Sequence, residues 1–194
     1  MKYVKMLGLA AIAAAALMAF VGAGSASATT LTCEGSACSV GANFHSESNG
    51  KAVLDAPFGN VECNSTVQGE VTSATEASVK ITELKWTNCG SDNVVTLASG
   101  TLKITNIAGT KNGTVTSTGA EVTVEHVGTH CIFKTNGTSL GTLTGTTTTG
   151  ATGSFDISAT IPRSGGRSGV FCGSSAPWTG SYSIDAPMTG DVDA

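Results

Sequence analysis

The sequence predicts an all-β domain, an antiparallel β-sandwich of Ig-like or jelly-roll-like type, that follows an N-terminal signal helix. Three observations predict this class. Apolar and polar residues alternate along most of the chain, with the period of two that a half-buried strand requires. Turn dipeptides separate these runs, and helical periodicity is nearly absent. Only 12% of the residues are charged, so Thr, Ser and Gly fill the exposed positions, and β-branched Thr suits strands.

The first 28 residues have the pattern of a secretory signal peptide. Lys2 and Lys5 precede an apolar run at 7–20, and Ala26-Ser27-Ala28 follows as a cleavage site. The apolar run is shorter and richer in Ala than a membrane helix, which needs about 20 mostly apolar residues. We therefore expect a secreted protein that begins at Thr29 and has no membrane span after cleavage.

The remaining length favours one domain. We expect a loosely ordered lead-in at 29–50 and a single β-sandwich domain at 51–194. Removal of residues 1–28 takes away two lysines and no acid, so the formal charge changes from −4 to −6. This acidic balance argues against nucleic acid as a partner, because no basic stripe is available to neutralise phosphates.

Individual runs predict where side chains are buried. In the run 79–86, Val79 and Ile81 share one face of a strand, whereas Leu84 and Trp86 fall on the other. We therefore expect either a β-bulge near Glu83 or burial of both faces of this strand. Two later runs alternate cleanly. They predict burial of Phe155, Ile157, Ala159 and Ile161, and one shared face for Trp178, Gly180, Tyr182 and Ile184.

Three Asn-Gly dipeptides, at 49–50, 112–113 and 136–137, are typical of hairpin turns. Short strands at such spacing, without intervening helices, indicate an antiparallel sandwich or barrel, of which we expect the sandwich.

Six cysteines in a secreted chain indicate disulfides, and six allow fifteen pairings. Spacing favours one of them. Cys33 and Cys38 close a small local ring, Cys63 and Cys89 sit in neighbouring strand-like runs, and Cys131 with Cys172 closes a long loop. Metal binding by thiolates is the weaker alternative, because no C-x-x-C pair is present.

The runs at 56–65, 86–89 and 172–182 resemble a group of uncharacterised small secreted, cysteine-paired β-proteins of high-GC Gram-positive soil bacteria. The shared features are a strand that carries Cys63, a cysteine after an aromatic strand, and a final strand with Trp178 and Tyr182. The resemblance spans roughly residues 50–187 and implies secretion and a β-fold. It implies no activity and no site residue, and the acidic end at 191–194 departs from the group.

Several patterns could carry catalysis, and each has a simpler explanation. Residues 137–141 match G-x-S-x-G around Ser139, but a nucleophile elbow needs a helix after the serine, and a Thr/Gly run follows here. His130 and Ser164 lie too close in sequence to form a protease dyad across two barrels. We expect no catalytic residue and no cofactor.

Metal sites are also weak candidates. His126 and His130 flank a tight turn, where a hairpin could bring their rings together. Asp185, Asp191 and Asp193 offer oxygen ligands, but the sequence lacks a calcium-binding loop. We therefore assign no metal ligand.

Aromatic residues leave one further alternative. Trp178 and Tyr182 are candidate ligand contacts if the protein binds sugars on an exposed aromatic platform, whereas Trp86 is expected to pack against a disulfide.

The expected function is that of a non-enzymatic extracellular or cell-envelope structural or interaction protein, with an envelope glycan or protein as its partner. The alternatives are a carbohydrate-binding module and a secreted protease inhibitor that uses the loop 163–169, with Arg163 and Arg167, as bait.

Overall fold

The computed structural model describes residues 29–33, 36–146, 153–166, 169–185 and 188–193, and the predicted signal peptide lies outside them. Its elements are β1 (Thr30–Cys33), β2 (Ser36–Ala37), β3 (Asn43–Ser48), β4 (Ala52–Ala56), β5 (Gly59–Ser73), β6 (Ser78–Thr87), β7 (Asn93–Ala98), β8 (Thr101–Asn106), β9 (Gly113–His126), β10 (Thr129–Thr144), β11 (Gly153–Gly166), α2 (Gly169–Cys172), β12 (Ser175–Asp185) and β13 (Met188–Asp193). The all-β class predicted from the sequence is confirmed. Within the described residues, no helix is both long enough and apolar enough to cross a membrane.

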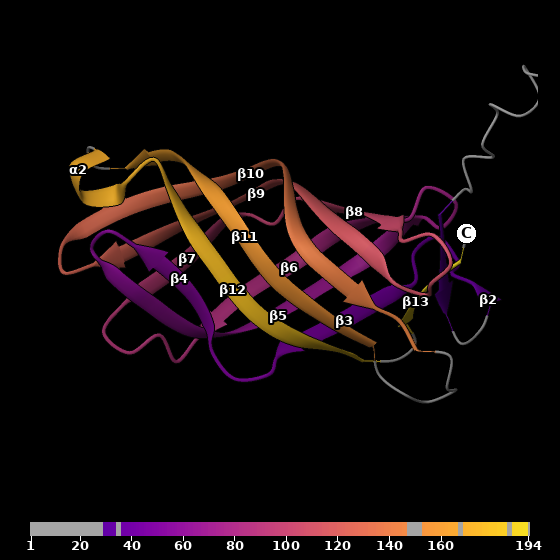
Figure 1. The fold of residues 1–194 in the computed structure, drawn as a ribbon. Coiled ribbons are helices and arrows are strands. Elements are labelled where there is room, and N and C mark those ends of the chain that lie inside the picture. Colours follow the sequence, from indigo (N-terminus) through magenta and orange to yellow (C-terminus); the bar gives the residue numbers. More distant parts are fainter. Residues whose placement is uncertain (1–28, 34–35, 147–152, 167–168, 186–187, 194) are drawn as a thin grey trace, which may run out of the picture.

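The main sheet closes on itself and forms a barrel with eight strand positions around its wall (Figure 1). Neighbours pair in the order β10-β11-β12-β3-β5-β6-β8-β9, and β9 also pairs with β10, which closes the circle. The predicted sandwich is therefore wrong. Alternation places one face of each strand inside, and this holds equally for two stacked sheets and for one closed sheet. The difference depends on the pairing of β9 with β10, along nearly the whole length of both strands.

Two of the eight positions are each filled by two short strands placed end to end. β3 and β4 both lie between β12 and β5, and β7 and β8 both pair with β9. In Figure 1, β4 and β7 lie toward one end of the barrel and β3 and β8 toward the other. We call the first of these the α2 end, because α2 lies there, and the second the β1 end.

A small separate sheet, in the order β13-β1-β2, covers the β1 end. The Leu31 backbone N–H donates a 3.0 Å hydrogen bond to the carbonyl of Ala74 in the turn between β5 and β6. The Leu31 side chain is fully buried and packs in a cluster that includes Phe44 and Val79. The stretch expected to be a loose lead-in thus supplies the covering strands β1 and β2 and the barrel strand β3.

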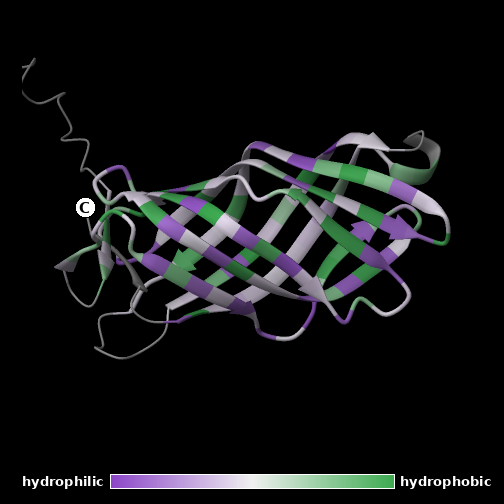
Figure 2. Ribbon diagram, turned by 180° about the vertical axis from the view of Figure 1, so that it is seen from behind, coloured by the Kyte–Doolittle hydropathy of each residue, from purple (hydrophilic) through white to green (hydrophobic). Residues whose placement is uncertain are grey.

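The predicted bulge near Glu83 is present. Gln68 pairs with Glu83 and Gly69 pairs with Ile81, so Thr82 is the extra residue on β6. The bulge allows Val79 and Ile81, and beyond them Leu84 and Trp86, to pack against the interior. Figure 2 shows the resulting alternation of hydrophobic and hydrophilic residues along the strands.

The Asn-Gly dipeptides have three different roles. Asn112-Gly113 ends the connection between the paired strands β8 and β9, as predicted. Asn49-Gly50 separates β3 from β4, which do not pair with each other. Asn136-Gly137 lies inside β10, where the register shifts and Gly137 has a φ of 65°. The hairpin prediction for this last dipeptide is wrong, because the positive φ of the glycine serves an irregularity in a long strand.

The three disulfides are Cys33–Cys38, Cys63–Cys89 and Cys131–Cys172, the pairs that spacing favoured. The first lies within the covering sheet at the β1 end. The other two lie at the α2 end, where Cys63 and Cys131 are buried parts of the barrel core.

Candidate ligand site inside the barrel

The barrel encloses a cavity of about 110 Å³. Its lining reaches from Trp178 to Ile184 on β12, six residues apart, which corresponds to about 20 Å along an extended strand. The cavity is therefore long and narrow. An engineered apolar cavity of about 150 Å³ in another protein stays dry and binds benzene, so this volume suits a slender ligand of a few carbon atoms.

No charged residue lines the cavity. Its walls are aliphatic and aromatic side chains that alternate inward from the strands, interrupted by a few hydroxyl groups and the Cys63 sulfur. Transfer of an isolated charged group from water into such surroundings costs far more free energy than transfer of a neutral group, because nothing there compensates for the lost hydration. The interior therefore suits uncharged, mainly apolar molecules.

Two pairs of buried hydroxyl groups satisfy each other in the barrel core. Ser65 Oγ and the Tyr182 hydroxyl share a hydrogen bond of 2.8 Å, and Ser117 Oγ and Thr135 Oγ1 share one of 2.9 Å. Burial raises the pKa of the Tyr182 hydroxyl to about 12, and the hydrogen bond with Ser65 lowers it in part. Thr135 Oγ1 also donates to the Ala120 carbonyl at 3.4 Å, so both hydroxyl groups of that pair are satisfied, whereas the single bond of the Ser65–Tyr182 pair uses one of its two O–H groups.

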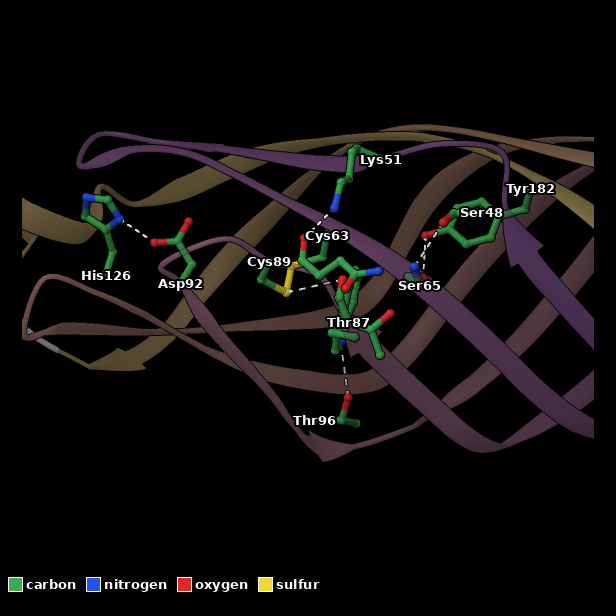
Figure 3. Close-up of a disulfide and its surroundings, with 12 residues drawn as sticks. Ser48, Lys51, Cys63, Ser65, Thr87, Cys89, Asp92, Thr96, His126 and Tyr182 are labelled. Carbon is green, nitrogen blue, oxygen red and sulfur yellow. Dashed lines mark hydrogen bonds and ion pairs between the residues drawn. A yellow bond between two sulfur atoms is a disulfide. The ribbon is translucent and has the colours of Figure 1, made fainter.

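The two tryptophans meet inside the α2 half of the barrel. The ring centroids of Trp86 and Trp178 are 5.9 Å apart, with the planes tilted by 58°, and both rings line the cavity. Trp86 Nε1 donates a 3.2 Å hydrogen bond to Thr96 Oγ1, and Thr96 Oγ1 in turn donates to the Leu84 carbonyl at 2.6 Å. The Trp86 N–H is thus a partnered donor. Figure 3 shows Thr96, its acceptor, and the Cys63–Cys89 disulfide.

Trp178 differs from Trp86 in this respect. Its Nε1 is the one buried side-chain nitrogen or oxygen, among the residues that the structure describes, for which no hydrogen-bond partner is found. Buried indole N–H groups usually have a partner, and a buried donor without one costs about 1–3 kcal/mol. A residue of the cavity lining therefore carries a buried donor without a partner, within walls that are mainly apolar.

Three turns meet at the α2 end, above the two tryptophans. Nδ1 of His126, at the end of β9, donates a hydrogen bond of 2.5 Å to Oδ1 of Asp92, in the connection between β6 and β7 (Figure 3). The ring of His126 stacks on Phe58, from the turn between β4 and β5, with centroids 5.4 Å apart. These contacts join three separate connections across this end of the barrel.

The candidate contacts Trp178 and Tyr182 share one face of β12, as the sequence predicted, and that face is the inward one. Tyr182 is buried and Trp178 is half-buried. They do not form an exposed platform. Sequence reasoning missed the unpartnered nitrogen of Trp178, because a hydrogen-bond partner depends on side chains from other strands. It also missed the contact of His126 with Asp92, for which the only sequence signal was the turn beside His126.

The other candidates lie apart from this cavity. His126 pairs with Thr129 across the turn, so His130 falls on the opposite face of the hairpin, and the two imidazoles do not meet. Ser139 is an exposed residue within β10. No group of three or more metal-ligating side chains is found in the described part of the chain.

The C-terminal aspartates and the arginine loop complete the candidates. Asp185 Oδ2 lies 2.9 Å from His45 Nδ1, and the side chains of Asp191 and Asp193 lie outside the described residues. Arg163, expected in a loop, belongs to β11 and pairs with Phe133 of β10.

Comparison with known proteins adds no relative: no family model, no curated protein and no solved structure matches this chain.

Proposed function

We propose that this protein is an extracellular, non-enzymatic binding protein that holds a small apolar ligand inside its barrel. The observation that carries the proposal is the cavity inside the barrel, in whose lining no charged residue is found among those that the structure describes. Pockets of this kind, apolar with a few placed polar groups, are the usual sites of small-molecule binding.

Two further observations support the extracellular part of the proposal. The three disulfides are typical of proteins in oxidising surroundings, and the first 28 residues have the signal-peptide pattern. We place the mature protein outside the cell, either free or held to the cell envelope by non-covalent contacts.

The carbohydrate-binding and inhibitor alternatives have less support. A sugar platform needs exposed aromatic faces, whereas Trp86 and Trp178 are tilted against each other and turned to the core. A protease inhibitor needs a preorganised, projecting loop, whereas Arg163 is paired within a strand.

The test uses two neighbouring residues of β7. Val94 lines the cavity and Val95, the next residue, is 44% exposed on the outside. We expect Val94→Phe to fill part of the cavity and to weaken hexane binding at least tenfold, and Val95→Phe to bind hexane as the unchanged protein does. Binding is followed by tryptophan emission, since both tryptophans of the chain line the cavity.

A thermal melt of each variant accompanies the titration, because an added ring inside a packed core costs about 1–3 kcal/mol. The melt separates a filled cavity from an unfolded barrel. Equal hexane binding by the two variants, or no saturable binding by the unchanged protein, would contradict the proposal.

A further inference from the structure

One buried donor restricts the ligand beyond "small and apolar". Trp86 and Trp178 line the same space in the same half of the barrel, yet only Trp86 has its indole N–H satisfied, by Thr96. The other buried polar pairs of the core, Ser65 with Tyr182 and Ser117 with Thr135, have partners within each pair. Among the residues that the structure describes, Trp178 Nε1 is therefore the fully buried polar atom that is left for a ligand oxygen to satisfy.

From this we infer that the natural ligand is an uncharged, slender molecule with one hydrogen-bond acceptor, a ketone, aldehyde, ester or ether oxygen, which accepts from Trp178 Nε1 while its alkyl part runs toward the β1 end. This inference rests on the proposed function and names the chemical class of its ligand.

The position of Trp178 determines the orientation of the ligand along the barrel. Trp178 pairs with Leu54 of β4, so it belongs to the α2 half of the barrel, whereas Phe44, Ile184 and Leu143 line the half that the covering sheet closes. The hydrogen-bonding end of the ligand is therefore near the α2 end. The remainder of the ligand meets a mainly apolar wall.

The lack of charge in the lining excludes two common ligand classes. A carboxylate, as in a fatty acid, would lose its hydration without meeting a cation, and burial of such a charge is strongly unfavourable. A sugar has many hydroxyl groups, and each would need a partner that this lining does not supply. A neutral acceptor matches the unpartnered N–H of Trp178.

The probes for the test are butyl methyl ketone, hexane and hexanoate, which are similar in length and differ in the polar group. The variants are Trp178→Phe, which removes the unpartnered donor, and Trp86→Phe, which removes the partnered one. Each variant keeps one tryptophan, so emission still reports binding.

We expect Trp178→Phe to lower the affinity for the ketone about fivefold relative to that for hexane, as loss of one net hydrogen bond of about 1 kcal/mol would do. Trp86→Phe should change both affinities together and leave their ratio as it was. Hexanoate at neutral pH should bind at least tenfold more weakly than the ketone.

A measurement on the unchanged protein does not depend on how the variants fold. The two indole N–H groups give two nitrogen–proton correlation signals, and Trp178→Phe identifies one of them. Saturation with the ketone should move the Trp178 proton signal downfield, whereas hexane should not.

The outcomes separate the two proposals. An unchanged ketone-to-hexane ratio in Trp178→Phe, or an unmoved Trp178 signal, would overturn the inferred oxygen contact while hexane binding still supported the apolar site. Tighter binding of hexanoate than of the ketone would also overturn it. Failure of both hexane and the ketone to bind would overturn the proposed function itself.

Discussion

The two ends of the barrel are closed by different means. At the β1 end, an additional sheet covers the opening, and the buried Leu31 side chain fills it from within. At the α2 end, turns from different hairpins meet through side chains, with Phe58, His126 and Asp92 in contact. The sheet that closes the β1 end is held by backbone pairing, and its Leu31 side chain belongs to the hydrophobic core. The second depends on a few side-chain contacts at the surface.

The disulfides follow the same division. Cys33–Cys38 closes a short loop within the covering sheet and ties it to no barrel strand. Cys63–Cys89 and Cys131–Cys172 span separations of 26 and 41 residues, and they hold the connections of the α2 end to the barrel wall. The end with weaker non-covalent closure is thus the one with stronger covalent closure. Because side-chain contacts between turns open more readily than a packed sheet, we expect a ligand to enter at the α2 end.

The largest effect should come from the long cross-link at the α2 end. In the loop-entropy model, a disulfide that closes about 40 residues contributes roughly 4 kcal/mol, and one that closes about 5 contributes roughly 2 kcal/mol. We therefore expect Cys131→Ala with Cys172→Ala to lower the free energy of unfolding by about twice as much as Cys33→Ala with Cys38→Ala.

Urea unfolding of the two paired variants measures this difference. The pair Cys63→Ala with Cys89→Ala serves as an intermediate control, because its loop length lies between the other two. A greater loss from the Cys33–Cys38 variant would show that the covering sheet, and not the α2 end, depends on its cross-link.

Tyr182, inside the barrel, tests whether both ends exclude water. Its pKa is about 12 in the folded protein and about 10 in the unfolded chain, so the folded state holds the proton more tightly. The stability from the buried neutral hydroxyl is complete below pH 10 and is lost as the pH rises through 12. At about 1.4 kcal/mol per pKa unit, the loss amounts to roughly 3 kcal/mol.

The measurement compares the unchanged protein with Tyr182→Phe combined with Ser65→Ala, so that no buried hydroxyl is left unpaired. Urea unfolding at pH 9 and at higher pH should show the steeper decline in the unchanged protein. Parallel declines in the two proteins would mean that solvent reaches Tyr182 and that one end is open.

Parts of this arrangement were predictable from the sequence because they depend on neighbours along one strand. Alternation placed Trp178 and Tyr182 on one shared face, and the break in alternation near Glu83 predicted either a bulge or burial on both faces, of which the bulge is present. Closure of the barrel was not predictable in this way. Closure depends on which strands pair. The alternation of β9 would be the same whether it paired with β10 or with another strand in a sandwich.

The candidate site was less predictable than the fold. Trp178 was identified as an aromatic candidate, but its chemical interest comes from a missing partner, which only the packed structure can show. Likewise, Phe58, Asp92 and His126 come from three connections far apart in sequence, and no local pattern links them. Features made by contacts between strands or turns leave no periodic signal.

The smallest predicted effect concerns the side-chain closure at the α2 end. His126→Phe keeps an aromatic ring to stack on Phe58 but removes the hydrogen bond to Asp92, whose side chain is only 9% exposed. We expect a loss of about 2 kcal/mol in unfolding free energy, because a hydrogen bond to a charged group contributes roughly 1.5–3 kcal/mol. His130→Ala is the matched control, because His130 is exposed on the opposite face of the same hairpin, and such changes stay within about 0.5 kcal/mol.

The effect of His126→Phe on hydrogen exchange near the substitution should be clearer than its effect on the unfolding free energy. In His126→Phe, hydrogen exchange should quicken at the amides of the three turns around Phe58, Asp92 and Val127, and it should stay unchanged in the β1–β13 pair. If the α2 end is also the entry, hexane should associate faster with this variant, while its equilibrium affinity changes little, because the cavity lining is intact. Faster exchange in the covering sheet, or unaltered association, would place the entry at the β1 end and reverse the assignment of the two closures.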